Sequence, residues 1–221
     1  MFDLDGLMFN TEDIFQEVGH EVLRRRDRRM TAELLQRMMG RRAPEAIAAM
    51  IEYHGLTDSV QDLIDETREM FFELAAGRLA PMPGLFGLLD HIERQSLPKA
   101  VATSSARRYL EEILRRFELL DRFDFTLTAE DVEQGKPHPE IYLTAARRLA
   151  LAPPQMLVLE DSHVGSLAGA RAGAVVVSVP TDHSRDQDFS HATHVVERLD
   201  DPLVLSLLAS PAPDGLDVCR S

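Results

Sequence analysis

The chain has few cysteines, few basic residues and no long apolar stretch, and each of these absences excludes a class of compartment or partner. Its 221 residues include a single cysteine, Cys219, so no disulfide can form among them, and the first residues do not resemble a basic region followed by a hydrophobic signal core. No apolar stretch is long enough to cross a bilayer. Basic residues are few, since 24 Lys and Arg stand against 37 Asp and Glu, which gives a formal charge of −13. These absences predict a cytoplasmic protein that binds neither nucleic acid nor an anionic membrane surface.

The chain is long enough for a core with a smaller unit attached, and its pattern favours that organisation. From Glu12 to Leu79 the residues are rich in helix formers, with apolar residues at helical spacing and no convincing strand. Breaks near Met30, between Gly40 and Pro44, and between Gly55 and Ser59 divide this stretch into about four helices. We therefore predict that residues 11–80 form a helical bundle.

The rest of the chain alternates short apolar runs with helical stretches, which is typical of a parallel sheet. A first strand leads to Asp3, and later strands are expected at Ala100–Thr103, Phe123–Leu127, Met156–Glu160 and Val175–Val179. Helices are expected near 84–95, 106–117, 139–150 and 164–172. We predict an α/β fold whose core is a doubly wound, Rossmann-like parallel sheet formed by residues 1–10 and 81–221. The helical bundle would be inserted as a lid, and the site would lie beyond the carboxyl ends of the strands.

The most informative motif opens the chain, where Asp3 and Asp5 are separated by one residue and followed by Gly6. On an extended segment the two carboxylates share a face, and the glycine lets the backbone turn away. With a divalent cation beside them, one carboxylate can attack phosphorus while the other handles the leaving group's proton. The same residue types also form ordinary turns, so the motif alone is equally consistent with a simple strand end.

Three further polar motifs follow predicted strands. Thr103 and Ser104 offer hydroxyls and helix-start amides to phosphate oxygens, although capping of the next helix is the simpler interpretation. Lys136 precedes a stiff Pro-His-Pro sequence, where it can neutralise transferring oxygens or lie in solvent as a loop lysine. Asp161 follows a strand whose residues are typical of a buried strand. It is either a further metal ligand or an acidic cap. Because each of these motifs follows a predicted strand, we favour the interpretation that they form one phosphoryl-transfer site together.

Together, the four motifs resemble those of the haloacid dehalogenase superfamily. The matching segments are Phe2-Asp3-Leu4-Asp5-Gly6, Ala102-Thr103-Ser104, Gly135-Lys136-Pro137 and Leu159-Glu160-Asp161-Ser162. The helical insert resembles the superfamily's first type of cap. Within the superfamily the chain is most similar to the group of beta-phosphoglucomutase, CbbY-like proteins and small sugar-phosphate or phosphoglycolate phosphatases. This resemblance implies a magnesium-dependent phosphatase that hydrolyses a small phosphorylated metabolite through an aspartyl-phosphate intermediate.

The resemblance also implies a role for each motif residue. Asp3 would be the nucleophile, and Asp5 the general acid and base. The phosphate would be bound by Thr103, Ser104 and Lys136. The Mg²⁺ ion would be held by Asp3, Asp161 and the backbone carbonyl of Asp5.

The chain departs from the family pattern in two places. Only Met1 and Phe2 precede the first aspartate, where members carry several apolar residues, so we expect a short first strand and a natural coding sequence that begins upstream. Mutases of this group use a cap histidine and a cap arginine where this chain has Phe15 and Ala43.

The competing functions follow from these departures. Phosphatase is favoured over sugar-phosphate mutase, and a non-catalytic module that binds a phosphorylated metabolite is the third interpretation. Dehalogenation is disfavoured because it does not need the second aspartate. Arg41 and Arg42 are candidate substrate contacts or a solvated helix end, and the run Arg24–Arg26 with Arg28 and Arg29 is expected to be a solvated helical face. The sequence names neither the substrate nor the oligomeric state.

Overall fold

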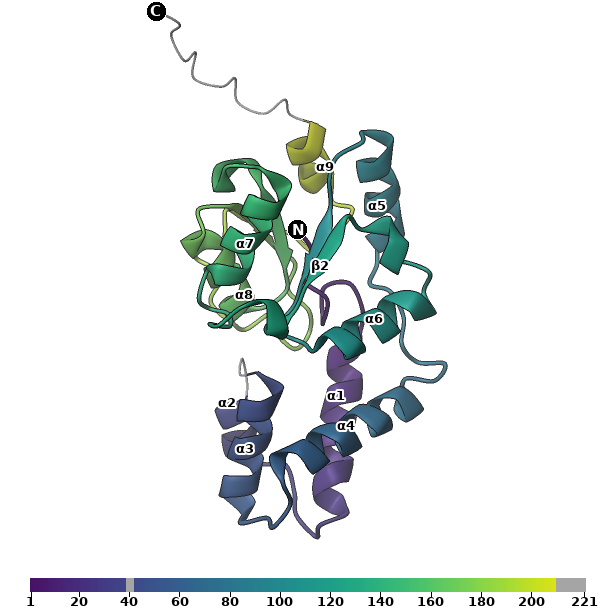
Figure 1. Ribbon diagram of the computed structural model, residues 1–221, viewed down its shortest axis with the longest axis vertical. Helices are drawn as coiled ribbons and strands as arrows, with labels where there is room; N and C mark the ends of the chain where they lie inside the picture. Colours follow the sequence, from purple (N-terminus) through teal and green to yellow (C-terminus); the bar gives the residue numbers. More distant parts are fainter. Residues whose placement is uncertain (39–41, 210–221) are drawn as a thin grey trace, which may run out of the picture.

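The computed structural model describes residues 1–38 and 42–209, and it shows an α/β part with a helical region beneath it (Figure 1). The helical region contains α1 (Thr11–Arg24), α2 (Ala32–Met38), α3 (Ala43–His54) and α4 (Val60–Leu74). The strands are β1 (Ala100–Ala102), β2 (Phe125–Leu127), β3 (Leu157–Glu160), β4 (Val175–Ser178) and β5 (His194–Val195). The helices around them are α5 (Leu85–Arg94), α6 (Arg107–Arg116), α7 (Glu140–Leu149), α8 (His163–Arg171) and α9 (Pro202–Ala209). Short 3₁₀ helices span Leu120–Arg122, Ala129–Asp131 and Pro153–Gln155.

The N-terminal segment joins two groups of parallel strands into one layer. β1 pairs with β2, and β3, β4 and β5 pair in that order, all in parallel. Between these groups Phe2 bridges Val101 on one side and Leu159 on the other. The Phe2 amide donates to the Ala100 carbonyl at 3.0 Å, and the Leu159 amide donates to the Met1 carbonyl at 2.9 Å. The predicted first strand is therefore short, as expected, and it forms isolated bridges in place of a regular strand.

Alternate residues of the strands face two different hydrophobic clusters, because side chains alternate across a sheet. Val101, Leu159 and Val177 belong to a cluster with the buried residues of α5, α6 and α9. Ala102 and Val158 belong to a second cluster with the buried residues of α7 and α8. Helices thus cover both faces of the sheet, with α7 and α8 on one side and α5 and α6 on the other in Figure 1. This arrangement confirms the predicted doubly wound α/β fold.

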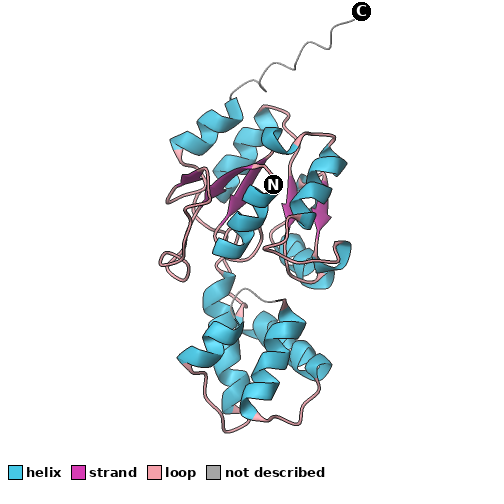
Figure 2. Cartoon of the chain, turned by 90° about the vertical axis from the view of Figure 1, so that its left-hand side faces the viewer, coloured by secondary structure: helices cyan, strands magenta, loops and turns pink. Residues whose placement is uncertain are grey.

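The described residues of the helical region form no strand (Figure 2), and α1 packs against α4 through buried apolar side chains. The chain passes between the two parts at two segments that pair with each other. Phe9 bridges Pro81 in antiparallel fashion, and the Met82 amide donates to the Met8 carbonyl at 2.8 Å. We propose that this paired crossing is the hinge between a core of residues 1–10 and 81–221 and a cap of residues 11–80. Within the described residues, no helix has the length and apolar character needed to cross a bilayer.

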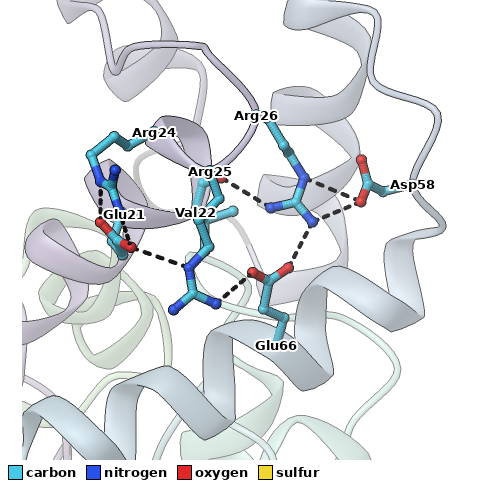
Figure 3. Close-up of polar contacts among 7 residues, drawn as sticks. All are labelled: Glu21, Val22, Arg24, Arg25, Arg26, Asp58 and Glu66. Carbon is cyan, nitrogen blue, oxygen red and sulfur yellow. Dashed lines mark hydrogen bonds and ion pairs between the residues drawn. The ribbon is translucent and has the colours of Figure 1, made fainter.

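The arginine run at the end of α1 connects two helices of the cap, as Figure 3 shows. α1 ends at Arg24, so the predicted helical face is wrong for the following arginines: Arg25 and Arg26 lie in a turn, and Arg28 and Arg29 lie beyond it. Arg26 is half-buried, and its guanidinium donates to Asp58 at 2.7 Å and to Glu66 at 2.6 Å. Arg25 reaches the same Glu66 at 3.2 Å. These contacts join the end of α1 to α4, which stabilises the end of the cap distant from the sheet.

Candidate active site

The four sequence motifs meet at the carboxyl edge of the sheet, where Lys136 connects them. Its ammonium donates to Asp3 Oδ1 at 2.6 Å, to Glu160 Oε1 at 2.5 Å and to the Ala102 carbonyl at 3.0 Å. Asp3 is 7% exposed, and Glu160 is fully buried. Burial alone would lower the pKa of Lys136, but the Asp3 and Glu160 carboxylates hold it well above its usual value. The lysine is therefore charged and fixed beside Asp3.

The loop that carries Lys136 is held by the start of α7. The Glu140 carboxylate accepts hydrogen bonds from the backbone amides of Glu133 and Gln134, each at 2.9 Å. These two bonds lower the pKa of Glu140, so the carboxylate stays charged and the loop stays anchored. Tyr142 on α7 then donates to Glu160 Oε1 at 2.5 Å. Lys136 is thus fixed both through its loop and through its carboxylate partner.

Three carboxylates form an acidic cluster at this edge, namely Asp3, Glu160 and Asp161. One ligand oxygen from each lies within 4.8 Å of the others, and all three side chains are buried. Burial raises the pKa of Asp3, and the charge of Glu160 raises it further. Burial also raises the pKa of Asp161, followed by the charge of Asp3. A single ammonium leaves this set with excess negative charge, and an all-oxygen donor set of this kind fits a hard divalent cation.

Gly6 makes room for this cluster. It has a φ of 78°, and a side chain at this position would collide with the Asp161 carboxylate. The backbone therefore turns directly after Asp5 and brings the first motif against the last one. The sequence motif Asp-x-Asp-Gly needs its glycine for this close approach as well as for the turn.

Asp5 is held by two hydroxyl groups that do not belong to the predicted site residues. Tyr109 donates to Asp5 Oδ1 at 2.8 Å, and Ser105 donates to Asp5 Oδ2 at 2.6 Å. Tyr109 is buried in the first turn of α6, where burial, and next the charge of Asp5, raise the pKa of its phenol. The phenol therefore remains protonated and keeps donating. No motif signals this tyrosine, because the contact joins α6 to the N-terminal segment.

Replacing Tyr109 by phenylalanine is expected to lower kcat about tenfold or more, with a smaller effect on KM. The variant removes one of the two donors that orient Asp5, and a hydrogen bond to a charged group contributes about 1.5–3 kcal/mol. Steady-state kinetics on any accepted phosphate ester checks this. Tyr53→Phe is the control, because Tyr53 contacts Thr31 and Glu33 within the cap. Equal kcat values for Tyr109→Phe and Tyr53→Phe would contradict the assignment.

Thr103 and Ser104 lie where β1 ends, beside Ala102, which accepts from Lys136. Thr103 is 1% exposed, and its hydroxyl accepts a hydrogen bond from the Ser105 amide at 3.0 Å. Ser104 is half-buried at the start of the turn that leads into α6. Both predicted phosphate contacts therefore lie at the same edge as Asp3, and the Thr103 hydroxyl also shapes the turn.

Gly165 on α8 is the second glycine that the site requires. A Cβ at this position would collide with the Glu160 carboxylate, which is the partner of Lys136. Gly165→Ala is therefore expected to reduce kcat/KM at least about tenfold and to lower the free energy of unfolding by about 1–3 kcal/mol.

Gly87→Ala is the matched control for this substitution, since Gly87 lies in α5 with open space around its Cβ position. It should leave activity unchanged and stabilise the protein by up to about 1 kcal/mol. Thermal unfolding and kinetics of both variants check the expectation. Similar effects of the two substitutions would show that Glu160 does not need this space.

Of the two cap arginines, Arg41 lies outside the described residues, whereas Arg42 is placed at the start of α3. A Cβ at Gly135 would lie 2.5 Å from Arg42 Nε, so the guanidinium packs against the loop of Lys136. Its Nη2 atom is buried, and it has no hydrogen-bond partner in the described part of the chain. Arg42 thus reaches from the cap to the edge of the acidic site.

A family model described as haloacid dehalogenase-like hydrolase matches residues 1–179. The chain belongs to this family. Haloacid dehalogenase-like hydrolases that it resembles include (DL)-glycerol-3-phosphatase 2 of Arabidopsis thaliana, with 34% identity over 86% of this chain and 81% of that protein. Another is the phosphorylated carbohydrates phosphatase of Thermotoga maritima, with 32% identity over 78% of this chain and 80% of that protein.

Solved structures of the family agree with this assignment. CbbY from Rhodobacter sphaeroides, crystallised in complex with phosphate, has a TM-score of 0.84 and 25% identity. The match covers 95% of this chain and 97% of CbbY. The predicted membership of the haloacid dehalogenase superfamily is confirmed, and the protein is a phosphatase of this family. The family is typically metal-dependent, which agrees with the acidic cluster.

Proposed function

We propose that the protein is a magnesium-dependent phosphatase of small sugar or polyol phosphates that works through an aspartyl-phosphate on Asp3. The observation that carries this proposal is the pairing of the buried Asp3 carboxylate with the Lys136 ammonium at 2.6 Å, beside Asp161. A carboxylate placed beside a fixed positive charge can approach a phosphate dianion, because the lysine offsets the repulsion between them.

In the proposed reaction Asp3 attacks phosphorus, and the ester oxygen leaves with a proton from Asp5. Lys136 neutralises the transferring oxygens, while Thr103 and Ser104 bind the others at the end of β1. Mg²⁺, held by Asp3, Asp161 and the backbone carbonyl of Asp5, would supply further charge neutralisation when bound. Water then hydrolyses the aspartyl-phosphate, with Asp5 taking its proton.

Asp5 can serve as acid and base only if its carboxylate reaches the leaving group. In this structure both of its oxygens accept hydrogen bonds, from Tyr109 and Ser105. Each carboxylate oxygen has a second lone pair, so Asp5 can transfer a proton to and from the substrate oxygen while the two hydroxyls hold it in place.

The choice of substrate class rests on the relatives and on the cap. The Arabidopsis relative is named for glycerol 3-phosphate and the Thermotoga relative for phosphorylated carbohydrates. Both names describe a phosphate ester on a small hydroxylated carbon skeleton. Arg42 adds a guanidinium at the edge of the site, and we propose that it contacts the substrate. Arg42→Ala is then expected to raise KM about tenfold with a smaller change in kcat.

The cap supports hydrolysis over transfer to a second sugar. Phe15 packs on Phe71 and Tyr109, with ring centroids 4.6 Å and 5.6 Å away. Ala43 is exposed at the start of α3. Neither position therefore offers a polar group that could hold a sugar bisphosphate for a return of the phosphoryl group.

Phosphate release from a panel of sugar phosphates, glycerol 3-phosphate, phosphoglycolate and nucleotides, measured with and without Mg²⁺, tests the proposal. Magnesium-dependent release from sugar or polyol phosphates supports it. Isomerisation of a sugar phosphate without net release would favour the mutase. Binding of these compounds without turnover would favour the non-catalytic module.

A further inference from the structure

A second group of metal-binding side chains converges at the start of α8, and it shares no residue with the acidic cluster. It consists of His163, the first residue of α8, with Asp188 and His191 from the segment between β4 and β5. One ligand atom from each residue lies within 4.8 Å of the others. The two imidazole rings are 5.0 Å apart at an angle of 85°. Nothing in the proposed phosphatase reaction uses these side chains.

The ring of His163 is fixed by a hydrogen bond to the segment that carries Asp188. Its Nδ1 lies 2.6 Å from the backbone carbonyl of Asp188, and a carbonyl can only accept, so Nδ1 carries the hydrogen. The other ring nitrogen, Nε2, then carries the free lone pair, as is usual for a histidine oriented by a backbone carbonyl. The His163 amide also donates to Gln187 at 2.7 Å. Both the ring and the backbone of this residue are thus fixed to the segment that carries Asp188.

His191 contributes a ring nitrogen, Nε2, that is available to a metal ion. Its Nε2 atom is buried, and the described residues provide no hydrogen-bond partner for it. An unpaired polar atom in a buried position costs free energy, and a metal ion at this point would remove the cost.

Asp188 completes the donor set with a negative charge. The backbone amide of Ser190 donates to Asp188 Oδ1 at 2.9 Å, and this bond lowers the pKa of the carboxyl group. The side chain is exposed, so it can rotate toward the two rings. Three ligands around a tetrahedral ion with bonds of about 2.0–2.1 Å lie roughly 3.3 Å apart. Rotation of the exposed Asp188 side chain can bring its carboxylate toward this spacing.

We propose that His163, Asp188 and His191 form a binding site for a divalent transition metal ion such as Zn²⁺. Two imidazoles and one carboxylate suit zinc, which takes three protein ligands and a water molecule. The all-oxygen cluster of Asp3, Glu160 and Asp161 suits Mg²⁺ instead. The two sites therefore select different metals by the chemistry of their ligands.

The position of the site gives the metal a structural effect. The segment between β4 and β5 also carries His183, whose ring lies 2.7 Å from Asp13 and 3.0 Å from Gln16 at the start of α1. A metal ion would tie this segment to α8, close to Asp161 and to the first helix of the cap. Zinc is therefore expected to raise the thermal unfolding temperature.

Zinc binding to the full chain, measured by calorimetry in the presence of excess Mg²⁺, tests this proposal. Excess Mg²⁺ competes for the acidic cluster, and the intensity of Co²⁺ absorption in the visible range reports whether the bound ion is four-coordinate. Wild type and His20→Ala, which removes an exposed cap histidine, should each bind one Zn²⁺ with the same affinity. His191→Ala and Asp188→Asn should each bind it at least about tenfold more weakly and lose the rise in unfolding temperature.

No zinc binding by the wild type would overturn the site, and so would equal binding by all four proteins. His191→Ala lies outside the catalytic residues, so its phosphatase activity in Mg²⁺ should match that of the wild type. The proposal does not depend on the phosphatase function, because its readouts are metal affinity, Co²⁺ spectrum and unfolding temperature.

Discussion

Asp3→Asn is expected to abolish phosphate release, with a fall in kcat of roughly 10⁴-fold or more. An amide has no negative oxygen with which to attack phosphorus, so the aspartyl-phosphate cannot form. The substitution preserves the shape of the side chain and a hydrogen-bond acceptor for Lys136, whose ammonium lies 2.6 Å from Asp3 Oδ1. Loss of activity would then report lost chemistry, because the geometry around Lys136 is kept.

Two controls distinguish this result from misfolding. Asp121→Asn changes an exposed aspartate and should retain full activity. Burial raises the pKa of Asp3, so a neutral residue there should leave the metal-free protein at least as stable as the wild type. Wild-type phosphate release by a folded Asp3→Asn protein would exclude Asp3 as the nucleophile.

Removal of Mg²⁺ with a chelator is expected to have the second largest effect, a loss of almost all turnover that added Mg²⁺ restores. The three buried carboxylates of the acidic cluster repel an incoming phosphate dianion unless a cation offsets their charge. Asp161→Asn should raise the Mg²⁺ concentration needed for half-maximal activity at least about tenfold. Activity that persists in chelator, or an unchanged Mg²⁺ requirement in Asp161→Asn, would contradict the proposed metal role.

The same carboxylates predict how the stability depends on pH. Burial raises the pKa values of Asp3 and Asp161 in the folded protein, so the folded state binds more protons than the unfolded state. The metal-free protein should therefore lose stability as the pH rises above about 4, where unfolded aspartates ionise. Bound Mg²⁺ favours the ionised forms, so its stabilising effect should grow with pH. Thermal unfolding at several pH values, with and without Mg²⁺, checks this, and Asp161→Asn should show a smaller effect.

Much of the fold could be predicted because the sequence pattern is strong in the core. The expected helices near 106–117 and 139–150 match α6 and α7 to within about two residues, since apolar spacing and prolines mark their limits. The sequence pattern does not predict β5 or α9. β5 has only two residues, one of them a histidine, and is too short to produce an alternating pattern.

The sequence predicts those site residues whose positions follow from the order of the parallel strands. Asp3, Lys136 and Asp161 follow parallel strands or their loops, and the carboxyl ends of such strands meet at one edge. The sequence predicts neither the hydrogen bond from the Tyr109 hydroxyl to Asp5 nor the role of Glu160 as the partner of Lys136. These contacts depend on side-chain directions across elements that are distant in the chain, and no spacing rule encodes them.

The histidine cluster could not be predicted from the sequence for the same reason. His163 and His191 come from a helix start and from a separate segment, so they lack the short spacing by which zinc ligands are found in sequences. In the arginine run, the position of Arg25 and Arg26 past the end of α1 depends on the turn at Arg25–Asp27. Local charge alone does not show where that helix ends.

The most direct test of the central claim is to trap the phosphorylated enzyme. The wild type is mixed with an accepted phosphate ester and Mg²⁺, quenched in acid during turnover, digested, and analysed by mass spectrometry. We predict one phosphoryl group on the N-terminal peptide, located at Asp3, labile to hydroxylamine and absent from Asp3→Asn. A phosphoryl group on another residue, or rapid turnover with no phosphorylated peptide at any quench time, would contradict the account.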